Sequence, residues 1–428
     1  MVERKGLTRK STADARVDAT QWLAPSVSHP SKFHPVHFIP GRAMLAARRC
    51  FARGLRSGAK QVVEHDAHSS AFVLGDAILK YRPVLGTGVI DASSTVVPER
   101  HRGNGVGEQL CEALFAHARG ANLKILPSCS YIRDRYVPRH AESVGDLALQ
   151  SLDAGTPGLQ IEVAYTGVAT LRLSDARRRN PLHEALLLRL RDWLGDLAAD
   201  WPEHESSATS SQSATSLPRV GCVVIEACGP IFSSGHDIRD FVGADRIQVR
   251  SLLDLCTQVN LLLSAIPQIS VAAVAGGCLA AGAQLATSCD LLIAQRENAS
   301  FTLTGVHGRG FCHTPLVGYT GRLSAHKALE LAVLGETIDA EEAVRIGLAN
   351  RVVGASEWRD EVDSVSRRLA AGFNRNSADG KATLYRQAAT ADPVARYEVA
   401  SDAMVDMFMS PNWRNHMTRF LERKSTRE

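Results

Sequence analysis

Residues 223–241 read VVIEACGPIFSSGHDIRDF. The apolar run with which they begin predicts a buried strand, and this strand ends in the small, glycine-bearing turn FSSGHD at 232–237. A second apolar run, at 269–274, is followed by the small residues AAGAQ at 280–284. Two such turns, coming from separate strands, can aim backbone N–H groups at one point. A fixed pair of N–H donors stabilises negative charge that develops on a carbonyl oxygen. The alternative for Gly282 and its alanines is close helix packing, which also selects small residues.

The composition is that of an ordinary globular chain. The 428 residues exceed a typical single core, which predicts two domains. The net charge of +4 is small for this length and does not indicate a nucleic-acid partner. The nine cysteines form no C-x-x-C pair, and no histidine cluster has ligand spacing, so neither a disulfide framework nor a metal site is predicted. No apolar run reaches the length of about 18 residues that a membrane span needs.

Residues 1–60 form a basic leader. The part from Ser26 to Lys60 contains no Asp or Glu, and MLAARRCFARGLRSGAK, which starts at Met44, places arginines beside small and apolar residues. This composition is typical of a mitochondrial transit peptide and predicts a mitochondrial matrix protein. Translation starting at Met44 and a longer leader starting at Met1 both stay open, as does a basic tail without a targeting role.

A compact segment follows at 61–140. Short strands are predicted within 71–98, an amphipathic helix from Gly105 that closes at Gly120, and another strand at 123–132. The loop RHRGNGVG at 100–107 joins strand to helix. Its glycines let a ligand approach the backbone, and the helix N-terminus offers unpaired N–H groups. The loop therefore predicts a pyrophosphate cradle, with a tight strand–helix turn as the alternative.

This segment resembles the minimal branch of the GNAT acetyltransferase superfamily, through VVPERHRGNGVGEQL at 96–110 and LKILPSCSYI at 123–132. The resemblance implies that acetyl-CoA pyrophosphate is held by backbone amides of six loop residues. These residues are Arg102, Gly103, Asn104, Gly105, Val106 and Gly107. Cys129 is a candidate for accepting an acyl group, although a buried structural cysteine is an equally good interpretation.

From 161 to 428 the chain resembles the crotonase superfamily, also called the enoyl-CoA hydratase/isomerase family. The resemblance rests on RRRNPLHEALLLRL at 177–190, on the two stretches quoted first, and on LGETIDAEEAVRIGLANRVV at 334–353. It implies an α/β chain in which a small GNAT-like domain is followed by a ββα superhelix with a C-terminal helical trimerisation region. A linker is predicted at 141–160 and a flexible serine-rich insert at 204–218. The chain is expected to form homotrimers, or hexamers built from two trimers.

The crotonase resemblance also implies roles for individual residues. The oxyanion donors would be the amides of His236 and Ala281, and Ser234 would lie near the adenine end of CoA. The remaining predicted substrate-binding residues are Gly235, Asp237, Gly282, Gln284, Gly305 and Lys424. Acyl-CoA and acetyl-CoA are the expected ligands, and no tightly bound cofactor or metal is expected.

The chain departs from the crotonase pattern at the two glutamates that serve as acid and base in hydration. They align with Gln284 and Gly305, and neither an amide nor a hydrogen atom transfers a proton. Standard hydration is therefore doubtful. The other candidate bases are His236, Asp240, His307, Cys312 and His313, each of which also has a structural interpretation. Two hypotheses stand: an enzyme that stabilises a thioester enolate, and a non-catalytic acyl-CoA and acetyl-CoA sensor or assembly protein.

Overall fold

A computed structural model of the chain describes residues 62–84, 87–199, 201 and 220–425. The predicted leader at 1–60 and the predicted insert at 204–218 lie outside these residues. The GNAT-like segment builds one sheet, and the C-terminal part of the chain contains sheets of seven, four and two strands. Gln61–Glu428 forms one compact unit by its internal contacts. No helix among the described residues is both long and apolar enough to cross a membrane.

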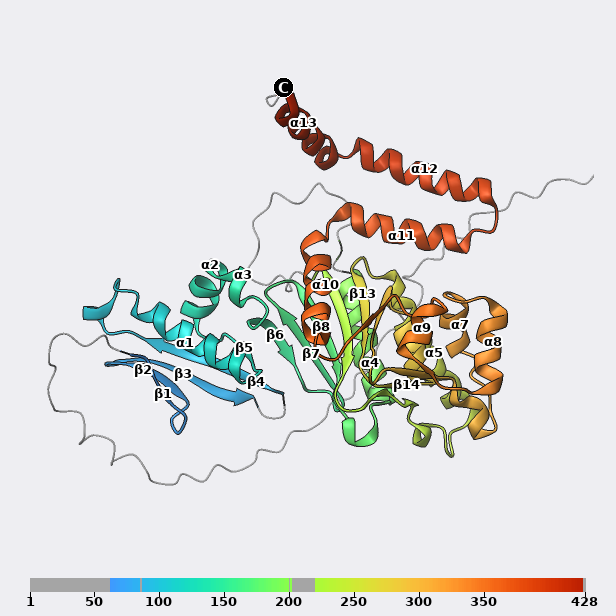
Figure 1. The fold of residues 1–428 in the computed structure, drawn as a ribbon, viewed down its shortest axis with the longest axis horizontal. Coiled ribbons are helices and arrows are strands. Elements are labelled where there is room, and N and C mark those ends of the chain that lie inside the picture. Colours follow the sequence, from blue (N-terminus) through green and yellow to red (C-terminus); the bar gives the residue numbers. More distant parts are fainter. Residues whose placement is uncertain (1–61, 85–86, 200, 202–219, 426–428) are drawn as a thin grey trace, which may run out of the picture. The chain divides into compact units, whose positions relative to one another are not determined.

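The GNAT-like segment is a five-stranded sheet in chain order with one long helix against it (Figure 1). Its strands β1 to β4 are antiparallel, and β5 runs parallel to β4. The sheet strands are β1 (Glu64–Asp66), β2 (Ala71–Leu74), β3 (Ala77–Val84), β4 (Val89–Val96) and β5 (Lys124–Leu126), and the helices are α1 (Val106–Gly120), α2 (Val137–Arg139) and α3 (Ala141–Val144). The apolar face of α1, including Leu110 and Leu114, is buried against the sheet.

The predicted linker at 141–160 is not a featureless connection. It contains α3 and the edge strand β6 (Leu149–Asp153), which pairs antiparallel with β7 (Leu159–Ala164). The Ile125 N–H of β5 donates to the Leu147 carbonyl over 2.8 Å, and Gln160 donates to the Thr87 carbonyl over 3.2 Å. The backbone pairing of β6 with β7 and the side-chain bond of Gln160 fix this segment, so it is ordered although its composition is that of a loop.

The C-terminal part winds through repeated strand–strand–helix turns. The first strand of each turn joins a seven-stranded sheet of order β18-β15-β13-β10-β8-β7-β6, and most second strands join a four-stranded sheet of order β11-β14-β16-β17. The turns comprise β8 (Val168–Leu173), β9 (Pro181–Leu182) and α4 (Glu184–Ala199); β10 (Cys222–Ala227), β11 (Ile231–Ser233), β12 (Gly235–His236) and α5 (Arg246–Ala265); β13 (Ile269–Val274), β14 (Gly277–Leu279) and α6 (Ala281–Thr287); and β15 (Leu291–Gln295) and β16 (Ser300–Thr302).

The rest of the chain covers this core. It consists of α7 (Pro315–Thr320), α8 (Ala325–Leu334), β17 (Ile338–Asp339), α9 (Ala340–Arg345), β18 (Arg351–Val353), α10 (Trp358–Gly372), α11 (Arg375–Ala389), α12 (Pro393–Met409) and α13 (Pro411–Ser425). Helix α10 packs through Trp358, Val362 and Val365 on one face of the large sheet. Lys381 anchors α11, because its buried ammonium donates to the carbonyls of Leu263 and Gln268 and pairs with Asp290 over 2.7 Å.

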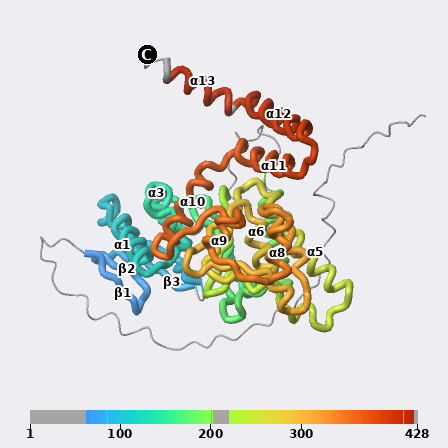
Figure 2. Tube along the Cα trace, turned by 45° about the vertical axis from the view of Figure 1, so that its right-hand side comes forward, coloured from blue at the N-terminus to red at the C-terminus, as the bar shows by residue number. Residues whose placement is uncertain are grey.

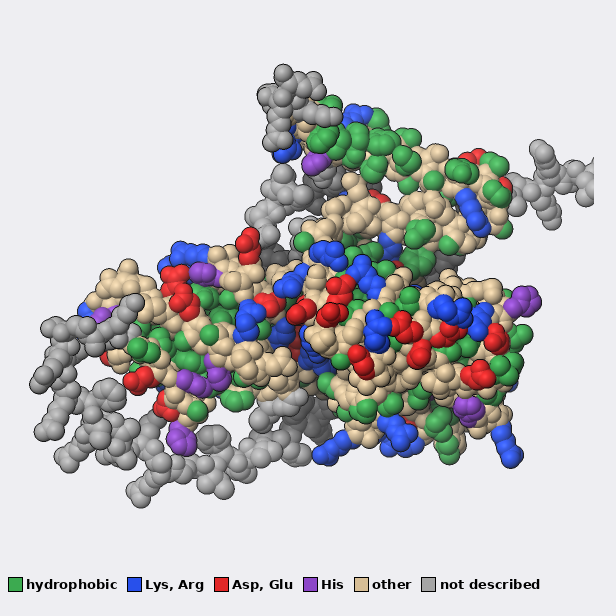
Figure 3. All heavy atoms as spheres, viewed as in Figure 1, with side chains coloured by type: hydrophobic (Ala, Val, Ile, Leu, Met, Phe, Trp, Pro, Cys, Tyr) green, Lys and Arg blue, Asp and Glu red, His purple; other side chains and the backbone are tan. Residues whose placement is uncertain are grey.

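The last two helices bury little of their own surface. Helix α12 has no buried residue, and α12 and α13 run on beyond α11 in both views (Figures 1 and 2). Apolar side chains gather on them in Figure 3. Those that are at least half exposed are Val394, Tyr397, Met404, Val405, Met409 and Leu421. These helices thus present an apolar surface that the described chain does not cover.

Candidate functional site

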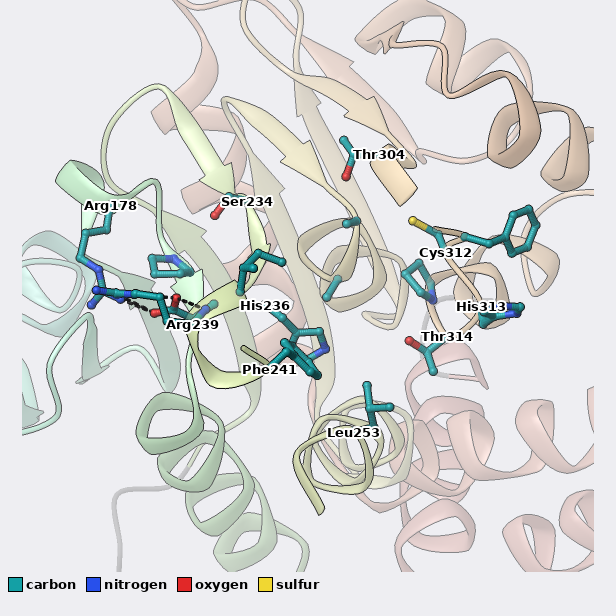
Figure 4. Close-up of a pocket in the computed structure, with 17 residues that line it drawn as sticks. Arg178, Ser234, His236, Arg239, Phe241, Leu253, Thr304, Cys312, His313 and Thr314 are labelled. Carbon is teal, nitrogen blue, oxygen red and sulfur yellow. Dashed lines mark hydrogen bonds and ion pairs between the residues drawn. The ribbon is translucent and has the colours of Figure 1, made fainter. Parts of the chain in front are cut away.

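A cavity of about 820 Å³ opens where the two quoted turns meet. Strand β12 and the start of α6 form one side, and residues 311–315 form the other (Figure 4). It is lined by Arg178, Pro181, Ser234, His236, Asp237, Ile238, Arg239, Phe241, Leu253, Ala280, Ala281, Thr304, Phe311, Cys312, His313, Thr314 and Pro315. The predicted donors His236 and Ala281 are therefore brought together from separate strand–helix turns.

Two backbone features place these amides. Gly235 has φ of +88°, and a Cβ added to it would lie 3.0 Å from the Ala281 nitrogen, so the two turns approach as closely as backbone allows. Ala280 also has a positive φ, +46°, which is strained for a residue with a Cβ. Its own N–H donates to the Thr302 carbonyl over 3.0 Å. Ala281 is the first residue of α6, so its N–H has no acceptor within that helix.

Gly282 serves close packing. A Cβ at this position would lie 2.6 Å from both the Cβ and the carbonyl oxygen of Ser233. The packing interpretation of the AAGA stretch is therefore confirmed for Gly282. It does not compete with the oxyanion interpretation, because Ala281 faces the cavity while Gly282 holds α6 against β11.

His236 is a buried titratable group that lines the cavity. Both of its ring nitrogens are buried, and the ring stands edge-on to Phe241. Burial lowers the pKa of His236, opposed in part by the Leu182 carbonyl and by the charge of Asp240. The imidazole is thus neutral near pH 7, the form that accepts a proton.

Asp237 holds a pair of arginines at the cavity. Its carboxylate accepts from Arg178 and, over 2.7 and 2.9 Å, from Arg239, and it also accepts from the Arg239 N–H. Asp237 therefore acts on this site through the arginines rather than as a free acid or base. The sequence reasoning missed Arg178 and Arg239, although the first lies in RRRN and the second lies two residues after the FSSGHD turn.

The opposite wall carries Cys312 and His313. The Cys312 sulfur accepts a hydrogen bond from the Gly305 N–H over 3.2 Å, and burial raises the pKa of its thiol. The His313 ring stands edge-on to Phe311 at 5.0 Å. Of the five candidate bases, His236, Cys312 and His313 line the cavity, whereas Asp240 and His307 do not.

The two positions aligned with the family glutamates lie outside this lining. Gln284 is 5% exposed and lines a second cavity. Gly305 stands behind the cavity wall, where a Cβ would lie 2.7 Å from the Cys312 nitrogen and 2.8 Å from the Phe311 carbonyl carbon. A side chain at 305 thus has no room in this arrangement. Lys424 belongs to α13, and its side chain lies outside the described structure.

The loop predicted to bind pyrophosphate forms an exposed turn. The residues Arg102, Gly103, Asn104 and Gly105 are all exposed, and φ is +82° at Gly103 and +75° at Gly105. Gly105 is the N-cap of α1 and no side chain caps that end, so the first N–H groups of α1 have no side-chain acceptor there. Val106 and Gly107 begin the helix, with the Tyr131 ring close to Gly107.

Cys129 lies inside the core of the GNAT-like segment. It is 8% exposed, its N–H donates to the Ala92 carbonyl over 2.8 Å, and its thiol lies 3.5 Å from the Thr95 hydroxyl. The neighbouring Cys111 is also buried, which raises the pKa of its thiol to about 12. Cys129 fits the packing interpretation, and its catalytic role stays a prediction.

Comparison with known proteins assigns the chain to a family. The family model described as enoyl-CoA hydratase/isomerase matches residues 209–427, about half of the chain. The chain belongs to the enoyl-CoA hydratase/isomerase family. A model described as GCN5-related N-acetyl-transferase also matches residues 71–147. Both predicted resemblances are confirmed. Family members act on CoA thioesters.

Individual relatives agree with this assignment. The rat mitochondrial enoyl-CoA hydratase domain-containing protein 3 is 33% identical over 60% of this chain and 80% of its own length. The structure of its human counterpart is 30% identical, with a TM-score of 0.53 over 60% of this chain and 95% of that one. An enoyl-CoA hydratase from Mycobacterium smegmatis is 33% identical, with a TM-score of 0.56 over 62% and 97%. The mixed α/β crotonase fold is thus confirmed.

Proposed function

We propose that the C-terminal part binds acyl-CoA and stabilises an enolate of its thioester through the amides of His236 and Ala281. The observation that carries this proposal is the convergence of these two residues, from separate turns, on one cavity. A carbonyl oxygen between the two N–H groups gains negative charge as the α-proton leaves. Preorganised donors stabilise that charge without having to reorient.

The proposed base is the His236 imidazole. It lines the cavity, and burial keeps it neutral, so one of its ring nitrogens can accept a proton. In the proposed step an imidazole nitrogen takes the α-proton, and the electrons of the broken C–H bond move onto the thioester oxygen. Return of the proton restores the thioester, so exchange with solvent needs no other reactant.

Arg178 and Arg239 would face the anionic part of CoA near Ser234, because both line the cavity and both are oriented by Asp237. In the GNAT-like segment, the amides at 102–107 would hold the pyrophosphate of acetyl-CoA. Both parts would then draw on one pool of CoA thioesters.

Water addition is not the proposed reaction. Gln284 and Gly305 replace the carboxylates that would activate water, and the only carboxylate that lines the described cavity, Asp237, is occupied by two arginines. This absence of a free acid supports the second candidate, a non-catalytic acyl-CoA sensor or assembly protein. The two candidates share the binding site and differ in whether His236 removes a proton.

The test uses the full-length chain and butyryl-CoA labelled with ¹³C at the thioester carbonyl. Isotope-edited infrared spectroscopy should show the carbonyl stretch at lower frequency in the bound ligand than in the free one, because two N–H groups polarise the bond. An unshifted stretch in a saturated complex would contradict the oxyanion site.

Incubation of the same complex in D₂O then separates the two candidates. Deuterium uptake at the α-carbon, measured by mass spectrometry and lost in His236→Gln, would establish the enolate chemistry. His236→Gln keeps the backbone amide, so the carbonyl shift should survive. A shifted carbonyl without deuterium uptake by the wild-type chain would favour the sensor.

The assembly and the location are part of the same proposal. The exposed apolar side chains of α12 and α13 support assembly into a homotrimer or a hexamer. Light scattering at micromolar concentration tests this assembly, and a monomeric mass would contradict it.

The basic leader and the mitochondrial names of the relatives support a location in the mitochondrial matrix. Sequencing the N-terminus of protein from purified mitochondria tests both the location and the removal of the leader.

A further inference from the structure

A thiol on the wall of the cavity proposed to bind acyl-CoA has no part in the enolate step. Cys312 is the only cysteine among the described residues that lines this cavity. Figure 4 shows its sulfur pointing toward the side on which Ser234 and His236 lie, whereas the His313 ring points the other way. A thioester held by the amides of His236 and Ala281 would thus place its acyl chain in a cavity that also holds a nucleophile.

The Cys312 sulfur lies beside the position that aligns with the second family glutamate. It accepts a hydrogen bond from the Gly305 N–H over 3.2 Å, and Gly305 is that position. A Cβ at 305 would lie 2.7 Å from the Cys312 nitrogen, so the backbone of Cys312 fills the space that a side chain there would need. Where the family pattern has a carboxylate that activates water, this chain therefore has a sulfur atom close by.

Two donors near the sulfur favour its ionised form. Burial raises the pKa of the Cys312 thiol, and the hydrogen bond from the Gly305 N–H opposes this rise. The Tyr319 hydroxyl is buried and has no hydrogen-bond partner among the described residues, and its pKa is raised by burial and by the charges of Cys278 and Cys312. A thiolate gives such donors an acceptor, and the thiolate is the form of cysteine that attacks an electrophile.

The oxyanion donors select the electrophile that suits this thiol. When a nucleophile adds to the β-carbon of an α,β-unsaturated thioester, the electrons of the double bond move onto the thioester oxygen. The product of this step is an enolate, which the amides of His236 and Ala281 are proposed to stabilise. Water is a poor competitor for the β-carbon, because neither Gln284 nor Gly305 can activate it.

We propose that Cys312 adds to the β-carbon of an α,β-unsaturated acyl-CoA and holds it as a covalent thioether. This inference rests on the proposed function, since the thioester must be held at His236 and Ala281. The S–H bond breaks, its proton passes to water, and a C–S bond forms at the β-carbon. The enolate then takes a proton from water at the α-carbon, so nothing leaves and no other reactant is needed. The site captures an electrophilic acyl-CoA rather than hydrating it.

The test is mass spectrometry of the full-length chain after incubation with excess crotonyl-CoA and an acid quench. The chain should gain the full mass of one crotonyl-CoA. Peptide mapping should show Cys312 modified at least about tenfold faster than any other cysteine, because the bound ligand is held in its cavity with a polarised carbonyl. Cys312→Ser should remove this adduct, and butyryl-CoA, which has no double bond, should form none.

Cys228→Ser is the matched control. Cys228 is partly exposed and does not line the cavity, so this variant should keep the adduct. A gain of the crotonyl group alone would show acyl transfer to sulfur and would overturn the inference, as would modification of Cys228 and Cys312 at equal rates.

An unmodified wild-type chain would also overturn the inference, and this result does not depend on any variant folding. The infrared shift of bound butyryl-CoA separates this failure from that of the proposed function. If the carbonyl stretch is shifted but no adduct forms, only the role of Cys312 is wrong. If the stretch is not shifted either, the oxyanion site itself is wrong.

Discussion

The two glycine-bearing turns of this chain use glycine for different reasons. In the loop before α1, a Cβ added to Gly103 or Gly105 would meet nothing within 4 Å, and both residues have positive φ. In the acyl-CoA site, a Cβ on Gly235 or Gly282 would lie within about 3 Å of neighbouring backbone. The first turn needs glycine for its backbone conformation and open access. The second needs it because two pieces of backbone touch.

Because of this difference, substitutions in the two turns should affect different properties, ligand binding in one and stability in the other. A substitution in the open loop should change what the loop binds while the fold tolerates it. A substitution in the packed turn should disturb the fold and the oxyanion geometry together.

The largest expected effect is on the rate at which the chain hydrates crotonyl-CoA. The wild-type chain should run at least about 10⁴-fold below an efficient rate of roughly 10 s⁻¹, because a missing acid or base costs about 10²–10⁴-fold each and both are absent. Loss of enoyl absorbance measures it. The double variant Gln284→Glu/Gly305→Glu should not recover the rate, since a Cβ at 305 meets the Cys312 nitrogen at 2.7 Å. A wild-type rate near 10 s⁻¹ would contradict the assignment of Gln284 and Gly305.

Gly282→Ala should lower the free energy of unfolding by about 3 kcal/mol, because its Cβ would overlap Ser233 and forced overpacking costs roughly 1–3 kcal/mol or more. Urea unfolding followed by circular dichroism measures this. The matched control is Gly195→Ala in the interior of α4, where a Cβ meets nothing and alanine favours the helix by up to about 1 kcal/mol. Equal stability of the two variants would show that α6 does not need the close contact.

Gly105→Asp should weaken acetyl-CoA binding by about tenfold, because a carboxylate at the N-cap of α1 takes the place at which an anionic pyrophosphate is stabilised. Gly105→Asn is the control, since asparagine tolerates the same left-handed backbone without the charge. Calorimetry measures both. If Asp and Asn weaken binding equally, the charge plays no part and the cradle interpretation fails.

The smallest expected effect is the pH dependence that His236 contributes. Burial holds the pKa of His236 in the folded chain below its unfolded value, so the unfolded chain takes up a proton first as the pH falls. The contribution to stability is constant above the unfolded pKa, about 6.5, and declines below it. Between pH 7 and 5, the free energy of unfolding should therefore fall less in His236→Gln than in the wild-type chain. If the free energy of unfolding depended on pH in the same way in His236→Gln and in the wild-type chain, the His236 imidazole would not be buried in its neutral form.

The sequence was enough to place both glycine-bearing turns after strands, to recognise both family resemblances and to notice that two glutamates are missing. These features depend on local pattern: apolar runs form strands, small residues end them, and Gly-rich loops precede helices. The same local reasoning treated 141–160 as a linker, because an edge strand such as β6 is defined by its pairing with β7 rather than by its composition.

The tertiary structure showed which further residues share a cavity with His236 and Ala281, the pair that the sequence had predicted. It placed Cys312 and Thr314, which lie in the connection before α7, around the same space. It also turned Gln284 toward a second cavity and filled the space beside Gly305 with the backbone of Phe311 and Cys312. The physical reason is that side-chain direction and close packing depend on neighbours distant in sequence, whereas strands and turns depend on adjacent residues.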